Sequence, residues 1–192
     1  RSGNSVMSHP LAGTAPKFND ADSDQASMQK LLDSTKDAYE HKVTIEWLLN
    51  ELLPFCSYVD ADPEPKIVSL EHVHHLGTEV AGQLSSPPCS ILELVNALHP
   101  TPAVGGDPQT EALTIIKRVE GIDRRRYAGP VGWLAADGDG EFAVGIRSAE
   151  VEANTARLFA GVGLVEDSDP QSELEETEAK FKTMLNTFLS TT

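Results

Sequence analysis

Glu173, Glu176 and Lys180 have the chemically most informative spacing in this 192-residue sequence. An α-helix turns once in about 3.6 residues, so spacings of three, four and seven place their side chains on one helix face. Two carboxylates and an ammonium group on one face can hold a divalent cation and an anion side by side. Just upstream, Gly161 and Gly163 form a glycine pair whose backbone a ligand can approach closely. The combination indicates a small anionic substrate and a divalent metal.

A solvated helix face is the alternative interpretation of the same residues. Acidic side chains are frequent throughout this segment, and those in a first helical turn interact favourably with the helix dipole. Glutamate and lysine four residues apart are also common on exposed helices. The spacing alone therefore leaves both interpretations open.

Arg147 is a second candidate for binding an anion. Strand alternation would place Arg147 on the same face as Ala143 and Gly145, opposite Val144 and Ile146. A guanidinium group pairs with a carboxylate through two parallel hydrogen bonds. We therefore expect Arg147 on the wall of a pocket lined by small residues, with an exposed strand arginine as the alternative.

The loop 99–106 contains prolines, which restrict the backbone, and glycines, which free it. This composition is typical of a pocket lip, although a plain connector is the alternative. Of the three nearby histidines, strand alternation puts His72 and His74 on one face and His75 on the other. Because no cysteine or carboxylate stands at a matching spacing, a single functional histidine is expected here rather than a zinc site.

The composition excludes several functions. A formal net charge of -15 argues against a nucleic-acid partner, which needs a basic surface. No apolar run approaches the length of a membrane span, and the first residues do not resemble a signal peptide. Cys56 and Cys89 are too few for a disulfide framework. We therefore expect a cytoplasmic protein with no membrane partner.

The order of the predicted elements indicates an α+β fold, because strands and helices mix without regular alternation. The turn Asp137-Gly138-Asp139-Gly140 predicts a hairpin between two of the strands. Helices are predicted at about 26–54, 91–98, 109–120 and 171–189, strands at 67–70, 74–80, 127–136, 141–148 and 155–161, and loops at 1–27 and 101–108.

Taken together, the segments resemble the chorismate-utilising enzymes, and more narrowly the isochorismate synthases. The resemblance spans nearly the entire chain, and many short matching sequence motifs occur in order. They are S-H-P-L-A-G-T-A-P (8–16), K-D-A-Y-E-H (36–41), H-L-G-T (75–78), L-H-P-T-P-A-V-G-G (98–106), R-R-Y-A-G-P-V-G-W (125–133), G-E-F-A-V-G-I-R-S-A (140–149), L-F-A-G-V-G-L-V (158–165) and S-D-P-x-x-E-x-E-E-T-x-x-K (168–180).

The resemblance implies a fold of antiparallel sheets flanked by helices, with residues 1–192 as the C-terminal part of a single chorismate-binding domain. The implied reaction is the Mg²⁺-dependent conversion of chorismate, the small-molecule substrate, to isochorismate. Water adds at C2 and the C4 hydroxyl leaves, which requires a general base and a general acid. In the family these are a lysine and a glutamate, expected before Arg1 in an N-terminal part. That part would be a partner of this chain, and residues 1–192 alone are expected to be inactive.

The resemblance also assigns residues to the metal and to the enolpyruvyl side of the substrate. Glu40 and Glu176 match the carboxylates that hold Mg²⁺, with Glu173 beside them. Magnesium prefers few carboxylates together with water and substrate oxygens, which suits this small set. The residues that match anchors of the enolpyruvyl side are Arg147, Lys180 and the backbone of Gly161.

Four further residues match positions around the substrate ring. Gly13 and Thr14 match a wall lined by backbone, and His75 matches the histidine near the C4 hydroxyl. Ala103 stands where anthranilate and aminodeoxychorismate synthases usually carry threonine or serine. A small apolar residue there is consistent with attack by water rather than by ammonia.

Two alternatives remain open. A salicylate synthase would make isochorismate and then release pyruvate from it. A chorismate-binding subunit without catalytic activity would use the same anchors. The resemblance does not decide whether a siderophore or a menaquinone pathway uses the product.

Overall fold

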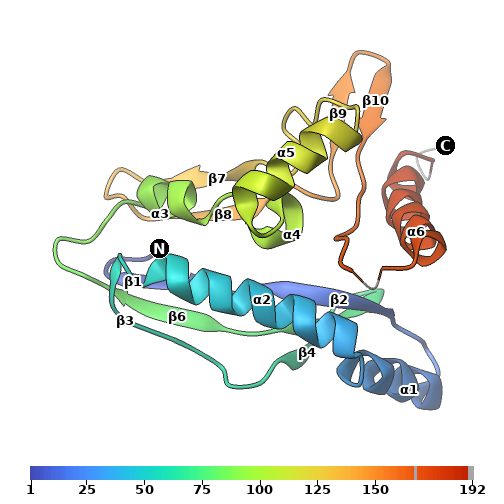
Figure 1. Ribbon diagram of the computed structural model, residues 1–192, viewed down its shortest axis with the longest axis horizontal. Coiled ribbons are helices and arrows are strands. Elements are labelled where there is room, and N and C mark those ends of the chain that lie inside the picture. Colours follow the sequence, from blue (N-terminus) through green and yellow to red (C-terminus); the bar gives the residue numbers. More distant parts are fainter. Residues whose placement is uncertain (167, 190–192) are drawn as a thin grey trace. The chain divides into compact units, whose positions relative to one another are not determined.

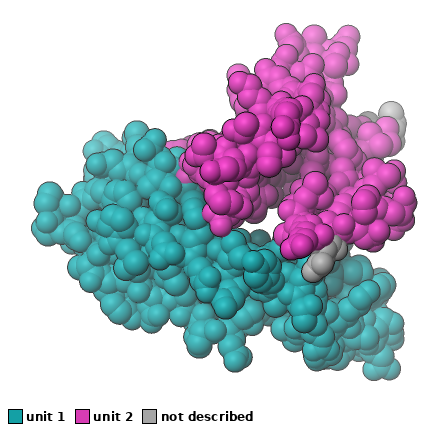
Figure 2. Space-filling model, in the orientation of Figure 1, with its two compact units in different colours: residues 1–98, 133–141 teal, residues 99–132, 142–192 magenta. Residues whose placement is uncertain are grey.

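The computed structural model describes residues 1–166 and 168–189. The chain forms two compact units, shown in separate colours in Figure 2. Unit 1 contains residues 1–98 and 133–141, and unit 2 contains residues 99–132 and 142–192. Helices and antiparallel strands occur without regular alternation, which confirms the α+β prediction. That residues 1–192 are part of one larger domain stays a prediction.

Unit 1 is built on two three-stranded antiparallel sheets (Figure 1). The first has the order β1–β6–β3, with β1 at Ser5–Ser8, β6 at Val80–Leu84 and β3 at Cys56–Ala61. The second has the order β2–β5–β4, with β2 at Leu11–Pro16, β5 at Val73–Gly77 and β4 at Lys66–Ser69.

The predicted loop at 1–27 is wrong, because β1 and β2 lie there. Both strands are short and pair with strands far along the chain: Val6 pairs with Gly82, and Ala15 pairs with His74. The predicted strand at 74–80 divides into β5 and β6, because residues 78 and 79 lie between two strands that pair in different sheets. The Thr78 hydroxyl lies 2.7 Å from Nε2 of the buried His41.

The predicted helix at 26–54 is two helices, α1 at Ala21–Leu32 and α2 at Thr35–Leu52. The break occurs at Ser34, whose side chain accepts a hydrogen bond from the Asp37 N–H at 3.2 Å and so caps α2. Helix α1 contacts β2 and β5, and α2 contacts strands of both sheets. Helix α3 at Ile91–Leu98 confirms the prediction for that segment and contacts α2.

Side chains of the helices and sheets bury one another in unit 1. Leu48 and Leu52 lie one turn apart on α2, and both are buried. Leu31 of α1 packs in a cluster with Ala15 and Leu76 from the second sheet. Each fully buried leucine stabilises the fold by about 1.5–3 kcal/mol.

Unit 2 holds α4 at Pro102–Gly105, α5 at Gln109–Val119, β9 at Ala149–Glu152, β10 at Thr155–Leu158 and α6 at Pro170–Leu189. The predictions for α5 and α6 are confirmed, whereas 101–108 contains a short helix and β9 was not predicted. Strands β9 and β10 pair antiparallel, and α6 contacts β10 (Figure 1).

The hairpin predicted at Asp137–Gly140 forms, with β7 at Pro130–Leu134 and β8 at Gly140–Val144. Both strands contain residues of unit 1 and of unit 2. No helix in the described part of the chain combines the length and the apolar character needed to cross a bilayer.

Replacing Leu52 by alanine is expected to lower the free energy of unfolding by about 2–5 kcal/mol, because it leaves a cavity in the core. Leu53, the next residue, supplies a matched control, since its exposed fraction is 58% against 1% for Leu52. Urea denaturation of the purified variants measures both values. Equal losses for Leu52→Ala and Leu53→Ala would contradict the placement of α2.

Gly13 and Gly3 supply a second matched pair, since both have positive φ, +63° and +56°. A Cβ at Gly13 would lie 2.8 Å from Leu31 Cδ1, whereas a Cβ at Gly3 meets no atom within 4 Å. Gly3→Ala should therefore show only the backbone strain of about 1–2 kcal/mol. Gly13→Ala should lose about 1–3 kcal/mol more from overpacking. Denaturation curves of equal midpoint would show that Gly13 is not confined.

Candidate functional site

Helix α6 brings together three of the predicted residues in unit 2. The Lys180 ammonium donates a hydrogen bond to the carbonyl oxygen of Gly161 at 3.1 Å and lies 2.6 Å from Oε1 of Glu176. The lysine side chain is mostly buried, while the glutamate is partly exposed. The contact confirms the prediction from helix spacing that Glu176 and Lys180 share one face of α6, whereas the role of this face in binding metal and substrate stays a prediction.

Glu173 lies one turn before Glu176 on α6, and only 5% of it is exposed. A carboxylate is rarely buried unless charges or hydrogen bonds compensate it. The two carboxylates form a donor set that suits Mg²⁺, which needs only one or two carboxylates beside water and substrate oxygens. Across residues 1–166 and 168–189, no three His, Cys, Asp or Glu side chains form a metal-binding group. Glu40 belongs to unit 1, so its role at the metal stays a prediction.

Tyr127 lies beside Gly161 in unit 2 and was not among the predicted site residues. Its ring stacks on Phe159 with centroids 5.2 Å apart and an interplanar angle of 11°. A Cβ on Gly161 would lie 3.2 Å from the Tyr127 hydroxyl, so the glycine lets the hydroxyl approach the backbone. Burial raises the pKa of Tyr127, which keeps its hydroxyl protonated as a hydrogen-bond donor. The only indication of Tyr127 in the sequence was that it lies in the motif at residues 125–133, which matches the family.

Arg147 does not lie on a strand, so the alternation argument is wrong for it. Strand β8 ends at Val144, and the chain then turns, with Arg147 at φ 49°. The backbone of Gly145 bonds to Gly129 at 2.7 Å, which draws this turn against the segment before β7. Arg147 is exposed, takes part in no ion pair found among the described residues, and acts electrostatically on Tyr127. Its role in binding an anion stays a prediction.

Ala103 lies exposed on α4, within the predicted lip. The next residue, Val104, accepts a hydrogen bond at its carbonyl oxygen from Arg124 Nη1 at 2.7 Å. A hollow of about 220 Å³ in unit 2 is lined in part by Val104, Arg124 and Tyr127. The loop therefore borders this hollow, and its role as the lip of a substrate pocket stays a prediction.

In unit 1, the structure brings together Gly13, Thr14 and His75. The carbonyl oxygen of Gly13 lies 2.6 Å from Nδ1 of His75, and the Thr14 hydroxyl lies 3.4 Å from the same nitrogen. Since a carbonyl oxygen can only accept a hydrogen bond, Nδ1 of His75 carries the proton and donates a hydrogen bond to the carbonyl oxygen of Gly13. In the neutral ring Nε2 is then a hydrogen-bond acceptor, which limits what His75 can do to a substrate hydroxyl.

Helix α2 adds carboxylates to unit 1. The Oδ1 atom of Asp37 would lie 2.9 Å from a Cβ on Gly13, so this carboxylate covers the glycine. Glu40 follows one turn later and forms an ion pair of 3.9 Å with Lys36. Asp37 was not predicted as a site residue.

The remaining histidines of β5 and its turn do not form a zinc site. His74 is buried, with Nε2 2.8 Å from Asp24 Oδ1 and Nδ1 2.8 Å from the Ser69 hydroxyl. This contact lowers the pKa of Asp24. His72 is exposed and lies 3.7 Å from Glu71. His75 thus remains the candidate functional histidine of this segment.

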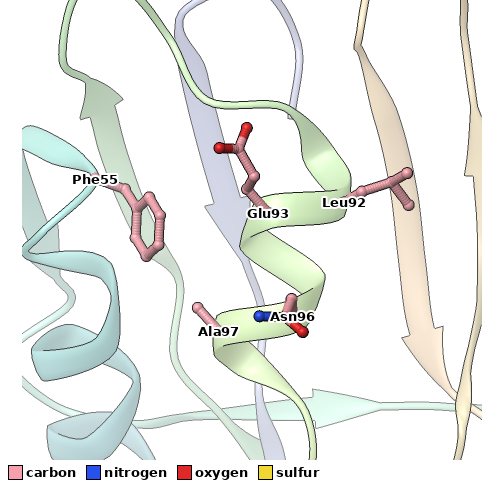
Figure 3. Close-up of a pocket in the computed structure, with 5 residues that line it drawn as sticks. All are labelled: Phe55, Leu92, Glu93, Asn96 and Ala97. Carbon is pink, nitrogen blue, oxygen red and sulfur yellow. The ribbon is translucent and has the colours of Figure 1, made fainter.

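A hollow of about 340 Å³ in unit 1 is lined by none of the predicted site residues (Figure 3). It lies between Phe55 and α3, where Ala97 and Asn96 also line it. Its carboxylate, Glu93, accepts hydrogen bonds from the backbone and hydroxyl of Ser90 and so caps α3. The lining therefore has the features of a helix cap and an apolar surface, not of an anion site.

Known proteins match this chain over nearly all of its length. The family model for chorismate binding enzymes matches residues 1–189. The isochorismate synthase DhbC of Bacillus subtilis is 45% identical over 185 residues, which cover 96% of this chain and 46% of the relative. The chain thus spans about half the length of the curated relatives it matches.

Solved structures agree with this match. The structure of DhbC from Bacillus anthracis superposes with a TM-score of 0.92 at 46% identity, covering 97% of this chain and 50% of that chain. MenF, the menaquinone-specific isochorismate synthase of Escherichia coli, gives a TM-score of 0.86 at 30% identity, covering 96% and 42%. Sequence family and fold therefore agree, and this chain belongs to the chorismate-binding enzymes.

Proposed function

We propose that the protein carrying this chain is an isochorismate synthase, which converts chorismate to isochorismate with Mg²⁺. The observation that carries the proposal is the arrangement of Lys180, Gly161 and Glu176, in which an ammonium group contacts both a backbone carbonyl and a helix carboxylate. The relatives named above are isochorismate synthases, which supports this member of the family. A cytoplasmic location also stays a prediction.

The proposed reaction adds water at C2 of chorismate, releases hydroxide from C4 and shifts the ring double bonds. It needs a general base for the water and a general acid for the departing hydroxyl. We assign these roles to a lysine and a glutamate outside the 192 residues. Residues 1–192 would then bind and orient the substrate without turning it over.

The enolpyruvyl side of the substrate would be bound in unit 2. Lys180 and Arg147 supply positive charge to its carboxylate, and the Tyr127 hydroxyl donates a hydrogen bond. Gly161 leaves the space into which the tyrosine hydroxyl and a ligand can approach. In a chain of net charge -15, these local cations are what attracts a dianionic substrate.

The metal carboxylates would be Glu40, Glu173 and Glu176. Bound Mg²⁺ would neutralise and orient the ring carboxylate of chorismate. Glu173 and Glu176 hold their carboxylates one helical turn apart, which suits a cation that keeps several water ligands. Lys180 balances part of the negative charge of this pair through its contact with Glu176.

His75 would orient the C4 hydroxyl rather than protonate it. Its Nδ1 proton is engaged by Gly13, so Nε2 accepts a hydrogen bond from the hydroxyl. Gly13 and Thr14 form the adjoining wall. Ala103 would present a methyl group to the ring, which offers no hydrogen bond to ammonia and is consistent with attack by water.

Product analysis tests the proposed function directly. The purified protein is incubated with chorismate and Mg²⁺, and the products are separated by chromatography and identified by mass. Isochorismate as the sole product supports the proposal. Salicylate with pyruvate would assign a salicylate synthase instead, and chorismate binding without turnover would assign a non-catalytic subunit. Turnover by the 192-residue chain alone would refute the assignment of acid and base outside it.

Glu176→Gln is expected to weaken Mg²⁺ binding in the presence of chorismate by more than about 100-fold, since losing even an outer-shell partner weakens metal binding about 10–100-fold. Calorimetric titration with Mg²⁺ measures the affinity, and isochorismate formation should fall in parallel. Glu178→Gln is the control, because Glu178 is exposed two residues along the same helix. Equal Mg²⁺ affinity in both variants would remove Glu176 from the metal site.

Lys180→Ala is expected to weaken chorismate binding by about 2–5 kcal/mol, because the enolpyruvyl carboxylate of the bound substrate then loses its charge partner. Lys182→Ala, which removes an exposed lysine from the next half-turn, should bind chorismate like the wild type. Equilibrium titration with chorismate measures both affinities. If Lys180→Ala bound chorismate with the affinity of the wild type, the acidic face of α6 would be a solvated helix face and not a binding site.

A further inference from the structure

Arg124 makes hydrogen bonds in three directions within unit 2. Its Nη1 donates to the carbonyl oxygen of Val104 at 2.7 Å, and its Nε donates to Oε2 of Glu120 at 2.8 Å. Its own carbonyl oxygen accepts a hydrogen bond from the Tyr127 N–H at 2.8 Å. One residue therefore connects the loop of α4, the C-terminal end of α5 and the segment that carries Tyr127.

The contact to Glu120 is a two-point fork, since Nη2 of Arg124 also bonds to Oε1 of that glutamate. The pair raises the pKa of Arg124, which stays charged. Only 25% of the Arg124 side chain is exposed, whereas the side chain of the next residue, Arg125, is 49% exposed and bonds to Glu150 at 3.2 Å. The two neighbouring arginines thus differ in how firmly they are held.

The loop that Arg124 contacts is short and depends on contacts with neighbouring elements, among them α5. Helix α4 is a single turn of four residues, and Thr101 at its N-cap makes no capping bond within the described chain. Such a turn is unstable without outside contacts. The hollow beside it, between Val104 and Tyr127, leaves that side without close packing. The guanidinium bond to Val104 therefore acts together with the contact between α4 and α5 in fixing where α4 and its residue Ala103 lie.

We propose that Arg124 is a positioning residue for chorismate, which sets the separation between Ala103 on α4 and the hydroxyl-bearing ring of Tyr127. The inference rests on the proposed function, because that function gives Ala103 and Tyr127 their places at the substrate. Glu120 shares this role, since its carboxylate orients the guanidinium plane.

Arg124→Lys tests the proposal. An ammonium keeps the charge but cannot bridge Glu120 and Val104 in the planar geometry of the fork. Misplacement of a binding group by about 1 Å can lower catalytic efficiency by about 100-fold. We expect the KM for chorismate to rise by about 10-fold or more, with a smaller change in kcat, and amide exchange at Val104, Gly105 and Gly106 to quicken. Arg125→Lys is the matched control and should change neither.

The readouts separate failure of the inference from failure of the proposed function. If the wild type forms no isochorismate, the proposed function fails. The inference about Arg124 is then tested by the chorismate affinity of the variants, measured by calorimetry in place of KM. Faster amide exchange with unchanged KM or affinity would show a structural role only and overturn the inference, as would identical behaviour of Arg124→Lys and Arg125→Lys. If Arg124→Lys does not fold, Glu120→Gln, which weakens the same fork and keeps its shape, decides by the same two measurements.

Discussion

The contact of the Lys180 ammonium with Gly161 and Glu176 is the interaction on which the proposed site depends. A chain of net charge -15 repels a dianion from most of its surface, so binding requires cations that the fold holds in place. Helix spacing brings Lys180 to Glu176, and the carbonyl oxygen of Gly161 holds the ammonium from the other side. A flexible surface lysine would gain little from one glutamate, but a mostly buried lysine held at two points forms a defined charge beside the carboxylate of Glu176.

The remaining parts of unit 2 are arranged around this contact. Tyr127 stacks on Phe159 and directs its hydroxyl at Gly161, where a larger residue would meet it. Arg147 leaves the end of β8 at a turn and contributes charge near that hydroxyl. These groups converge because short loops, not long strands, carry them. In unit 1 strands carry the candidate groups instead: His75 lies on β5, and the backbone carbonyl of Gly13 on β2 orients its ring.

Sequence periodicity predicted the features that lie within a single helix or strand. It did not predict the features that depend on contacts between distant segments of the chain. The face shared by Glu173, Glu176 and Lys180 follows from the helix repeat alone, so it was predictable. The strands β1 and β2 were not, because their partners lie far along the chain. Alternation failed for Arg147 since the strand ends before it and the chain turns. Tyr127 carries no periodic signal, and its place at Gly161 arises only when the segment before β7 packs on Phe159.

A structure of the protein with chorismate and Mg²⁺ bound tests the central claim most directly. The account predicts a substrate carboxylate within hydrogen-bond distance of Lys180 and the Tyr127 hydroxyl, and a metal that contacts the carboxylate of Glu176. Chorismate bound at full occupancy away from Gly161 and Lys180, or a metal that contacts no carboxylate of α6, would contradict it.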